Sequence, residues 1–402
     1  MKKIVLLSLC TSAVLMAGGY KIPEASLNAV ALGAANVAHS HGADAAYYNP
    51  ANMIFMKDEN IVESDLMYIG LSKIKYEGYT ASTGTLYNNI ESKKEDFIVP
   101  SLHYVSPDID GARFGLSIVS PAGLSKRWNN QPALSSAQEF TLTTVEINPS
   151  IALPIGDKVA IAVGIRAIYS EGIVKAYYPG GVVSQDMEGD SIDFGYNLAL
   201  SYKPSKELSF GLTYRSKVDL KMEGDADLFH YSYVNPKRNY STAVEIPVPA
   251  LLNLAVAYTF PTNTTVEFVF EKNYWSAYST LDFNYSDPYA EAVFGRASSK
   301  NWKDTSVYRF GITQELDKLT LMGGIVLDET PIPDESLGFE LPDSDSLSVS
   351  FGARYQMTEK INVGLAALYS MRDDRRTNDN NLNGEFKDSN VLIISAGLEY
   401  RF

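Results

Sequence analysis

The chain has 402 residues, a formal net charge of −14, 26 tyrosines, 28 glycines and a single cysteine. The acidic charge argues against nucleic acid as a partner, because binding a duplex requires neutralisation of its phosphates by Lys and Arg. Past the N-terminus, no apolar run approaches the roughly 20 residues of a membrane-spanning helix. The composition therefore fits either a soluble all-β protein or a membrane β-barrel.

The first 17 residues predict a secretory signal peptide. Two lysines precede a short apolar core, and small residues follow it. We expect cleavage after Ala17. The only cysteine, Cys10, lies inside this segment. The exported chain is therefore expected to contain no disulfide, although its compartment would permit one.

Short turn signals recur at a long and even period through the rest of the chain. They begin at Pro107, Pro154, Pro204, Pro261, Leu316 and Met357. Between successive turns lies one strand pattern, a longer polar loop and a second strand pattern, which is the layout of a transmembrane barrel. With one hairpin before the first turn and one after the last, the pattern predicts an all-β protein with fourteen antiparallel strands. Both termini are then expected on the periplasmic side.

Alternation with a period of two indicates that these stretches are strands with one apolar face. In one stretch the apolar face consists of Phe194, Tyr196, Leu198, Leu200 and Tyr202. Many of the patterns run to ten residues or more, which is longer than in an ordinary β-sandwich. The last strand ends on Phe402, and such an ending resembles the signal read by the outer-membrane barrel assembly machinery. We therefore favour an outer-membrane barrel over a soluble sandwich.

Residues 18–57 lack this alternation and are rich in alanine, which suits short helices and coil packed inside the barrel. The segment contains Asp44-Ala45-Ala46, then an aromatic pair and Asn49-Pro50-Ala51. This order resembles the hatch of the FadL/TodX family, outer-membrane transporters of long-chain fatty acids and hydrocarbons. Further stretches similar to family strands follow in the family's order: residues 147–153, 211–216, 302–305, 308–311, 328–333 and 341–345.

The resemblance implies a signal peptide at residues 1–17, a hatch that plugs the lumen at 18–57, and a fourteen-stranded barrel at 58–402. It also implies passive transport without a cofactor, with lateral exit into the membrane through a kinked third strand. The gate would involve Tyr48, Asn49, Pro50 and Ala51, together with Gly115 and Pro121 of a third strand expected at about residues 112–121. The alternative, that this strand simply ends at Pro121, stays open. We expect a monomer in contact with outer-membrane lipid and lipopolysaccharide.

An amphipathic acid in the lumen would need cations for its carboxylate and an apolar groove for its tail. Alternation directs Arg166, Arg215, Arg309, Arg354 and Arg401 into the lumen, and Arg309 and Arg166 are the preferred ligand contacts. The alternative is that these arginines only pair with lumen acids, for which the candidates are Glu146, Glu245, Glu267, Glu271 and Glu399. Apolar contacts are expected from Ile22, Leu27, Val30 and Leu32 of the hatch. An external docking groove is expected at Leu124 and Trp128, in the loop after the third strand, and at Phe229 and Tyr231, before the eighth. The loops at about residues 179–186 and 223–238 are only moderate in length for such a groove.

The histidines do not predict a metal site or a catalytic site. His39 and His41 form a His-x-His pair, but no third ligand of clear spacing accompanies them, so no metal site is predicted. A barrel hydrolase would need a Ser/His pair, and neither His103 nor His230 lies in a recognisable motif, so no enzyme is predicted. The alternative functions are a barrel-anchored surface adhesin or antigen, for which the loops are short, and a general porin, which the hatch opposes.

Overall fold

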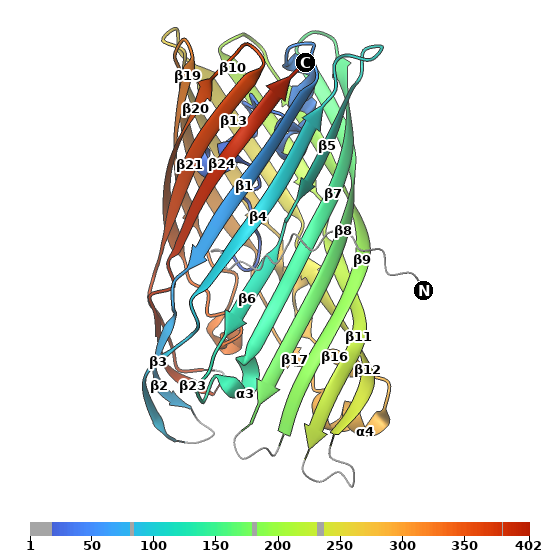
Figure 1. Ribbon diagram of the computed structural model, residues 1–402, viewed down its shortest axis with the longest axis vertical. Coiled ribbons are helices and arrows are strands. Elements are labelled where there is room, and N and C mark those ends of the chain that lie inside the picture. Colours follow the sequence, from blue (N-terminus) through green and yellow to red (C-terminus); the bar gives the residue numbers. More distant parts are fainter. Residues whose placement is uncertain (1–17, 81–83, 179–182, 231–236, 380) are drawn as a thin grey trace.

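The alternating segments form one closed antiparallel β-barrel (Figure 1). It closes where β1 (Ile61–Leu71) pairs with β24 (Val391–Arg401) on one side and with β4 (Glu95–Val105) on the other. The computed structural model describes residues 18–80, 84–178, 183–230, 237–379 and 381–402. The predicted fourteen-stranded antiparallel barrel is confirmed.

Four of the fourteen strands are interrupted, so that each consists of two segments. These are the third, β5 (Arg113–Val119) and β6 (Gly123–Arg127); the seventh, β10 (Leu208–Arg215) and β11 (Val218–His230); the eighth, β12 (Lys237–Val248) and β13 (Leu251–Thr259); and the ninth, β14 (Thr264–Asn273) and β16 (Phe283–Tyr285). The remaining strands are β7 (Glu139–Ile155), β8 (Val159–Tyr177), β9 (Val183–Tyr202), β18 (Thr305–Glu315), β19 (Leu319–Asp328), β20 (Ser346–Gln356) and β21 (Ile361–Arg372).

All six predicted turns join consecutive strands at one end of the barrel, which also carries the C-terminus and is called here the turn end (Figure 1). Longer connections lie at the opposite loop end. They contain a small sheet of β2 (Lys75–Thr80), β3 (Leu86–Glu91), β22 (Arg375–Thr377) and β23 (Leu382–Lys387). They also contain the short helices α3 (Leu134–Ala137), α4 (Pro288–Phe294) and η4 (Asp334–Ser336) and the strand β17 (Ser298–Ser299). β17 pairs with β15 (Thr280–Leu281), which lies with the helix η3 (Trp275–Ala277) in the interruption between β14 and β16.

Two of the predicted loops are shorter than expected, because the flanking strands extend into them. β9 already begins at Val183, and β11 continues to His230, so Phe229 lies in a strand. Tyr231 lies outside the described residues. The proposed docking loops are therefore reduced to short connections.

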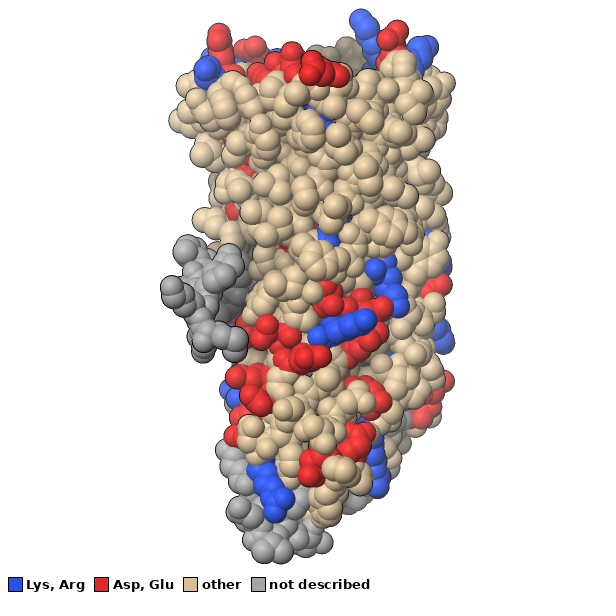
Figure 2. Space-filling model, turned by 90° about the vertical axis from the view of Figure 1, so that its right-hand side faces the viewer, with Lys and Arg blue, Asp and Glu red and all other residues tan. Residues whose placement is uncertain are grey.

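The outer face of the barrel is apolar over its turn-end half, because alternate side chains of each strand point outward. Phe194 of β9 is 69% exposed and Phe351 of β20 is 71% exposed. Towards the loop end, β8, β9 and β11 carry acidic side chains on the same outer face, and Figure 2 shows them as a charged band below the apolar surface. Glu171, Asp190 and Glu223 lie directly opposite one another in that band.

The N-terminal segment, residues 18–57, lies inside the barrel towards the turn end (Figure 1). It contains α1 (Leu27–Leu32), α2 (Ala45–Tyr48) and the 3-10 helix η1 (Pro50–Phe55). Wall glycines let its backbone approach closely: a Cβ on Gly324 would lie 2.4 Å from the carbonyl carbon of Leu32. Among the described residues, none of the helices has the length and apolar character needed to span a bilayer.

Candidate functional site

The N-terminal segment is fastened to the barrel wall by a buried carboxylate. Glu267 of β14 accepts hydrogen bonds from the backbone N–H groups of Val37 (2.7 Å), Ala38 (2.7 Å) and His39 (3.1 Å). Within the segment, Asp44 accepts bonds from the side chains of Ser26, Asn28 and Asn36. Because these donors and acceptors are buried, each bond satisfies a group that would otherwise lack water.

The Asn-Pro-Ala turn links the two halves of the segment to the wall. The Asn49 side chain donates to the Val37 carbonyl (2.8 Å) and to Ser201 Oγ (3.0 Å) of β9, and accepts from Ala51 N–H (3.2 Å). Pro50 occupies the first turn of η1, where a missing N–H costs nothing. The Tyr48 hydroxyl donates to the carbonyl of Pro23 and accepts from the N–H of Ala25, both at 2.7 Å.

The third strand is broken at residues 120–122 and then resumes, so it does not simply end at Pro121. β5 pairs with both β4 and β7, whereas β6 pairs with β7. Among the described residues, no ladder pair joins residues 95–101 of β4 to β6. Gly115, the predicted gate residue of β5, faces the segment, since a Cβ there would lie 2.8 Å from the Ala46 side chain.

The N-terminal segment pairs with the break from inside, and Thr144 of β7 accepts a hydrogen bond from Ala122 N–H (3.1 Å). Ile22 N–H donates to the Pro121 carbonyl (3.0 Å), and Gly123 N–H donates to the Tyr20 carbonyl (2.8 Å). Lys21 and Ala122 form the bridge between them. Backbone groups at membrane depth need such partners, because lipid supplies none.

A carboxylate lies beside this break. Glu24 lines a cavity of about 10 Å³ together with Ser101 of β4 and Ser120 of the break. Its Oε2 has no hydrogen-bond partner among the described residues. Burial raises the pKa of Glu24 to about 7, against the opposing effect of the nearby Arg309 and Lys21 charges.

Three of the five predicted lumen arginines, Arg166, Arg215 and Arg309, are buried. Arg354 is partly buried, with 12% of its side chain exposed, and each of these four arginines contacts a carboxylate. Arg166 and Arg215 share the fully buried Glu146, with Arg166 Nη2 at 2.9 Å from it. Arg215 also lies over the Tyr47 ring, 4.1 Å from the ring centroid. These contacts fit the alternative in which the arginines form a wall network.

The buried Arg309 and the partly buried Arg354 attach the N-terminal segment to the wall. Arg309 Nη1 donates to the Gly33 carbonyl (2.9 Å), and its Nη2 lies 3.3 Å from Glu271, which also binds Lys21. Arg354 pairs with Glu63 and donates to the Asn28 side chain at 2.6 Å.

Arg401 is only half-buried and pairs with Glu399 at the turn end. The prediction that Glu245 faces the lumen is wrong, because this residue is exposed on the outer face of β12. In the eighth strand, odd-numbered residues point inward in β13 but outward in β12. The interruption between the two segments reverses the alternation on which the prediction was based.

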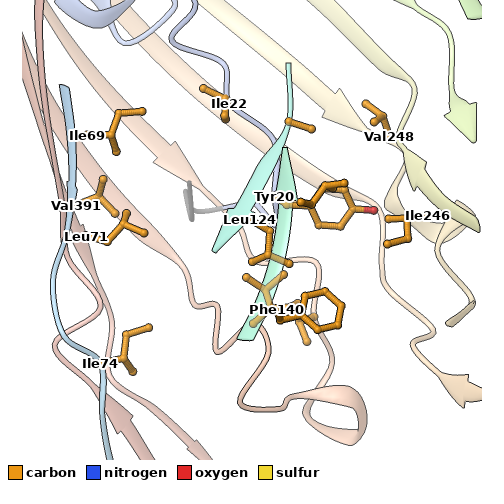
Figure 3. Close-up of a cluster of buried hydrophobic side chains, with 14 of the residues drawn as sticks. Tyr20, Ile22, Ile69, Leu71, Ile74, Leu124, Phe140, Ile246, Val248 and Val391 are labelled. Carbon is orange, nitrogen blue, oxygen red and sulfur yellow. The ribbon is translucent and has the colours of Figure 1, made fainter. Parts of the chain in front are cut away.

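Two small cavities lie in the lumen next to the N-terminal segment. One of about 50 Å³ is lined by Tyr48, Pro121, Arg166 and Arg215, which brings four predicted site residues together. Another of about 20 Å³ is mostly apolar. Figure 3 shows part of its lining, with Tyr20 between Leu124 and Ile246.

Two of the predicted external docking residues, Leu124 and Trp128, are buried. Leu124 lies in β6 and lines the apolar lumen cavity, because the third strand resumes after its break. Trp128 is fully buried, donates to the Phe339 carbonyl (2.9 Å) and packs edge-on against the Phe339 ring. Phe229 is half-buried at the end of β11. Leu124 and Trp128 therefore extend the lumen's apolar lining, whereas Phe229 lies on the opposite face of β11 from the buried Leu228.

His39, His41 and His103 all contact other side chains or the backbone of the protein. The His39 and His41 rings are 4.0 Å apart, and burial lowers the pKa of His39 to about 2. In the part of the chain that the structure describes, no cluster of three potential metal ligands occurs. His103 contacts Ser117 Oγ (2.9 Å) and the Ala25 carbonyl (3.0 Å), and both side chains are fully buried beneath the N-terminal segment.

Sequence reasoning missed several lumen residues. Tyr20 and Lys21 lie just after the predicted signal peptide, where no strand pattern drew attention to them. Lys126 and Arg372 lie on lumen faces of β6 and β21, and alternation extended past Leu124 would have indicated the former.

The closed barrel, its apolar outer face and its filled lumen define a plugged β-barrel of a bacterial outer membrane. Residues 8–402 match the family described as "Outer membrane protein transport protein (OMPP1/FadL/TodX)". The chain belongs to this family of outer-membrane proteins.

The relatives agree with this membership. The "Long-chain fatty acid transport protein" of Escherichia coli is 26% identical over 364 residues, covering 80% of this chain and 79% of the relative. The fold is similar to that of a Pseudomonas aeruginosa FadL homologue, with a TM-score of 0.83, 18% identity and coverage of 95% and 99% of the two chains. It is also similar to the Pseudomonas putida toluene transporter TodX, with a TM-score of 0.73, 16% identity and coverage of 95% and 98%.

Proposed function

We propose that this protein transports long-chain fatty acids or related hydrocarbons across the outer membrane by passive diffusion. The observation that carries the proposal is the open edge between β4 and β6, where no strand ladder forms among the described residues and the N-terminal segment pairs with residues 121–123. The substrate class is supported by two similar proteins, one named as a fatty acid transporter and one as a toluene transporter. The proposal requires no cofactor and no catalytic step.

In this proposal residues 1–17 are a signal peptide, residues 18–57 are the hatch and residues 58–402 are the barrel. The turn end faces the periplasm. A compound enters at the loop end, occupies the lumen cavities and leaves sideways when residues 20–22 move away from the break. Lateral exit suits an apolar compound, because it reaches lipid without crossing water. We further propose a monomer that contacts lipopolysaccharide and is recognised through Phe402 by the assembly machinery.

A reversible cross-link across the open edge tests lateral exit. Ser101→Cys and Ser120→Cys place thiols on two sides of the cavity beside Glu24, in a chain whose only natural cysteine is in the predicted signal peptide. The expected result is that oxidation blocks uptake of radiolabelled oleate by cells and that reduction restores it. Each single-cysteine variant is the matched control. Undiminished uptake with a fully formed disulfide would contradict lateral exit.

Conductance in planar bilayers separates this proposal from a general porin. A hatch that fills the lumen predicts little steady conductance for small ions. A large and steady open pore would favour the porin instead.

A further inference from the structure

A polar cavity of about 240 Å³ lies at the turn end, between the hatch and the barrel wall. It is larger than either lumen cavity and reaches the exposed turn residues 315–318. Asn36, Gly42 and Asp44 line it on the hatch side, and Arg354 of β20 lines it on the wall side. Because a cavity of roughly 150 Å³ holds a benzene molecule, this one has room for a small organic compound.

Three buried acceptor atoms at this cavity have no donor. Asp44 is fully buried, and the three side-chain hydrogen bonds described above all go to its Oδ2. Its Oδ1 has no partner among the described residues. Within the described chain, the same is true of Oδ1 of Asn36, which is 2% exposed, and of Oε2 of the fully buried Glu63 in β1.

Two of these oxygens face the same side of Gly42. A Cβ on Gly42 would lie 2.4 Å from Glu63 Oε2 and 3.2 Å from Asp44 Oδ1. Gly42 itself lines the cavity, so a group placed beside this glycine is close to both carboxylates. Hydrogen bonds from an ammonium group to a carboxylate are about 2.7–2.9 Å long, and one ammonium group carries several N–H donors. A single ammonium group can therefore donate to both oxygens.

The charges around the cavity favour a cation. Among the described residues that line it, six are carboxylates and four are lysines or arginines. The three unpaired acceptors exceed the one unpaired donor found there in the described chain, Arg354 Nη1. A buried carboxylate oxygen without a donor is unfavourable, because nothing replaces its hydration. The described side chains place no group of three ligands suited to a metal ion, so an organic cation fits the site better.

We propose that this cavity binds a small organic cation with primary ammonium groups, an alkyl diamine, from the turn end. One ammonium group donates to Asp44 and Glu63. The carbon chain extends outward, and the second ammonium group lies near the exposed carboxylates Glu315 and Glu359 at the rim. This site is separate from the lumen cavities, and its occupancy does not depend on which compound the barrel transports.

The position of the site links it to the hatch. Asp44 belongs to the hatch and Glu63 to the wall, so a bound diamine contacts both parts at once. A ligand that binds only the docked arrangement stabilises that arrangement. At ten times its dissociation constant, the diamine should lower the undocked fraction of the hatch about tenfold. Conducting events in planar bilayers should become rarer by the same factor when the diamine is added at the turn end.

Titration calorimetry of the purified full-length barrel with 1,4-diaminobutane tests the site. The expected result is binding of one diamine per barrel. The comparison ligand is the same diamine with both nitrogens fully methylated, which keeps both charges but has no N–H donor. It should bind about 10- to 100-fold more weakly, the usual range for hydrogen bonds to a charged group.

Two variants act on the site by different means. Asp44→Asn removes one charge and keeps the shape of the side chain. Gly42→Ala keeps every charge and places a methyl group against Glu63 Oε2 and Asp44 Oδ1. Each should weaken diamine binding about tenfold or more, since each removes at least one charged hydrogen bond. The matched control is Asp157→Asn, at an exposed turn residue that does not line the cavity, and it should bind as the wild type does.

Three results would overturn the inference. The first is no diamine binding by the folded wild type. The second is equally tight binding of the methylated diamine or of Mg²⁺, which would indicate a general attraction of cations. The third is unchanged binding in folded Gly42→Ala and Asp44→Asn. Thermal unfolding identifies a variant that does not fold, and the comparison of the two diamines on the wild type then decides.

The link to the hatch has its own test. A diamine that binds the barrel but leaves the frequency of conducting events unchanged would overturn the stabilisation of the docked hatch. None of these outcomes bears on the proposed transport function, which oleate uptake tests separately.

Discussion

The attachment of the hatch to Glu267 gives a direct test of the gating proposal. Replacing Glu267 with alanine removes the acceptor of three backbone N–H groups, those of Val37, Ala38 and His39. The barrel strand itself keeps its ladder, because these bonds involve only the side chain. The expected result is a hatch that leaves the lumen more often in an otherwise intact barrel.

The magnitude follows from the three bonds. If water reaches the freed N–H groups, each loss costs about 0.5–1.5 kcal/mol, and the hatch loses roughly 1.5–4.5 kcal/mol of docking free energy. If the site stays dry, each orphaned donor costs about 1–3 kcal/mol and the loss is larger. Even about 1.5 kcal/mol raises the undocked fraction about tenfold.

Single-channel recording in planar bilayers measures this fraction as the frequency and duration of conducting events. Glu267→Gln should fall between the wild type and Glu267→Ala, because its amide retains one acceptor oxygen and replaces the other with a donor. The matched control is Glu245→Ala, an exposed glutamate of the outer face. If Glu267→Ala conducted no more than this control, while remaining a folded barrel, the reasoning would be refuted.

Three further predictions follow from the lumen. Glu146→Ala leaves two buried arginines without their shared carboxylate and should destabilise the barrel by about 3–5 kcal/mol. Denaturant unfolding in detergent measures this loss of stability, and an unchanged unfolding midpoint would contradict the prediction. Burial raises the pKa of Glu24 to about 7 from its ordinary value near 4.5, so hatch docking should weaken as pH rises between these values and stay constant above them. Conducting events should therefore be rarer at pH 5 than at pH 7.5, and Glu24→Gln should abolish the difference. Gly19→Val should displace residues 20–22, because a Cβ at this position would lie 2.8 Å from the Trp275 ring and the backbone φ is +81°. Oleate uptake by cells measures the effect, and uptake equal to that of the wild type would contradict the prediction.

The sequence by itself determined the barrel and the direction of most of its side chains. Alternation is a local property of extended backbone, in which successive side chains point to opposite faces. For that reason the apolar outer face around Phe194 and the inward direction of Arg166, Arg215 and Arg309 were predictable. The even spacing of the turns was enough for the strand count, since each hairpin adds two strands.

Local alternation failed where a strand is interrupted. Residues of one parity face inward in β13 and outward in β12, and the same reversal separates β10 from β11. Glu245 was assigned to the lumen for this reason. A one-residue change of register moves every following side chain to the other face, and no local pattern reports it.

Only the tertiary structure decided which groups meet in the lumen. Lys21 and Glu271 are 250 residues apart, and barrel closure together with hatch docking brings them into contact. The third strand shows the same limit: Gly115, Pro121 and Gly123 were compatible with a kink or with a strand end. The choice depended partly on residues 20–22, whose backbone forms hydrogen bonds with Pro121 and Gly123 on either side of the break. Partners of this kind depend on how the whole chain closes, so a strand's own sequence does not contain them.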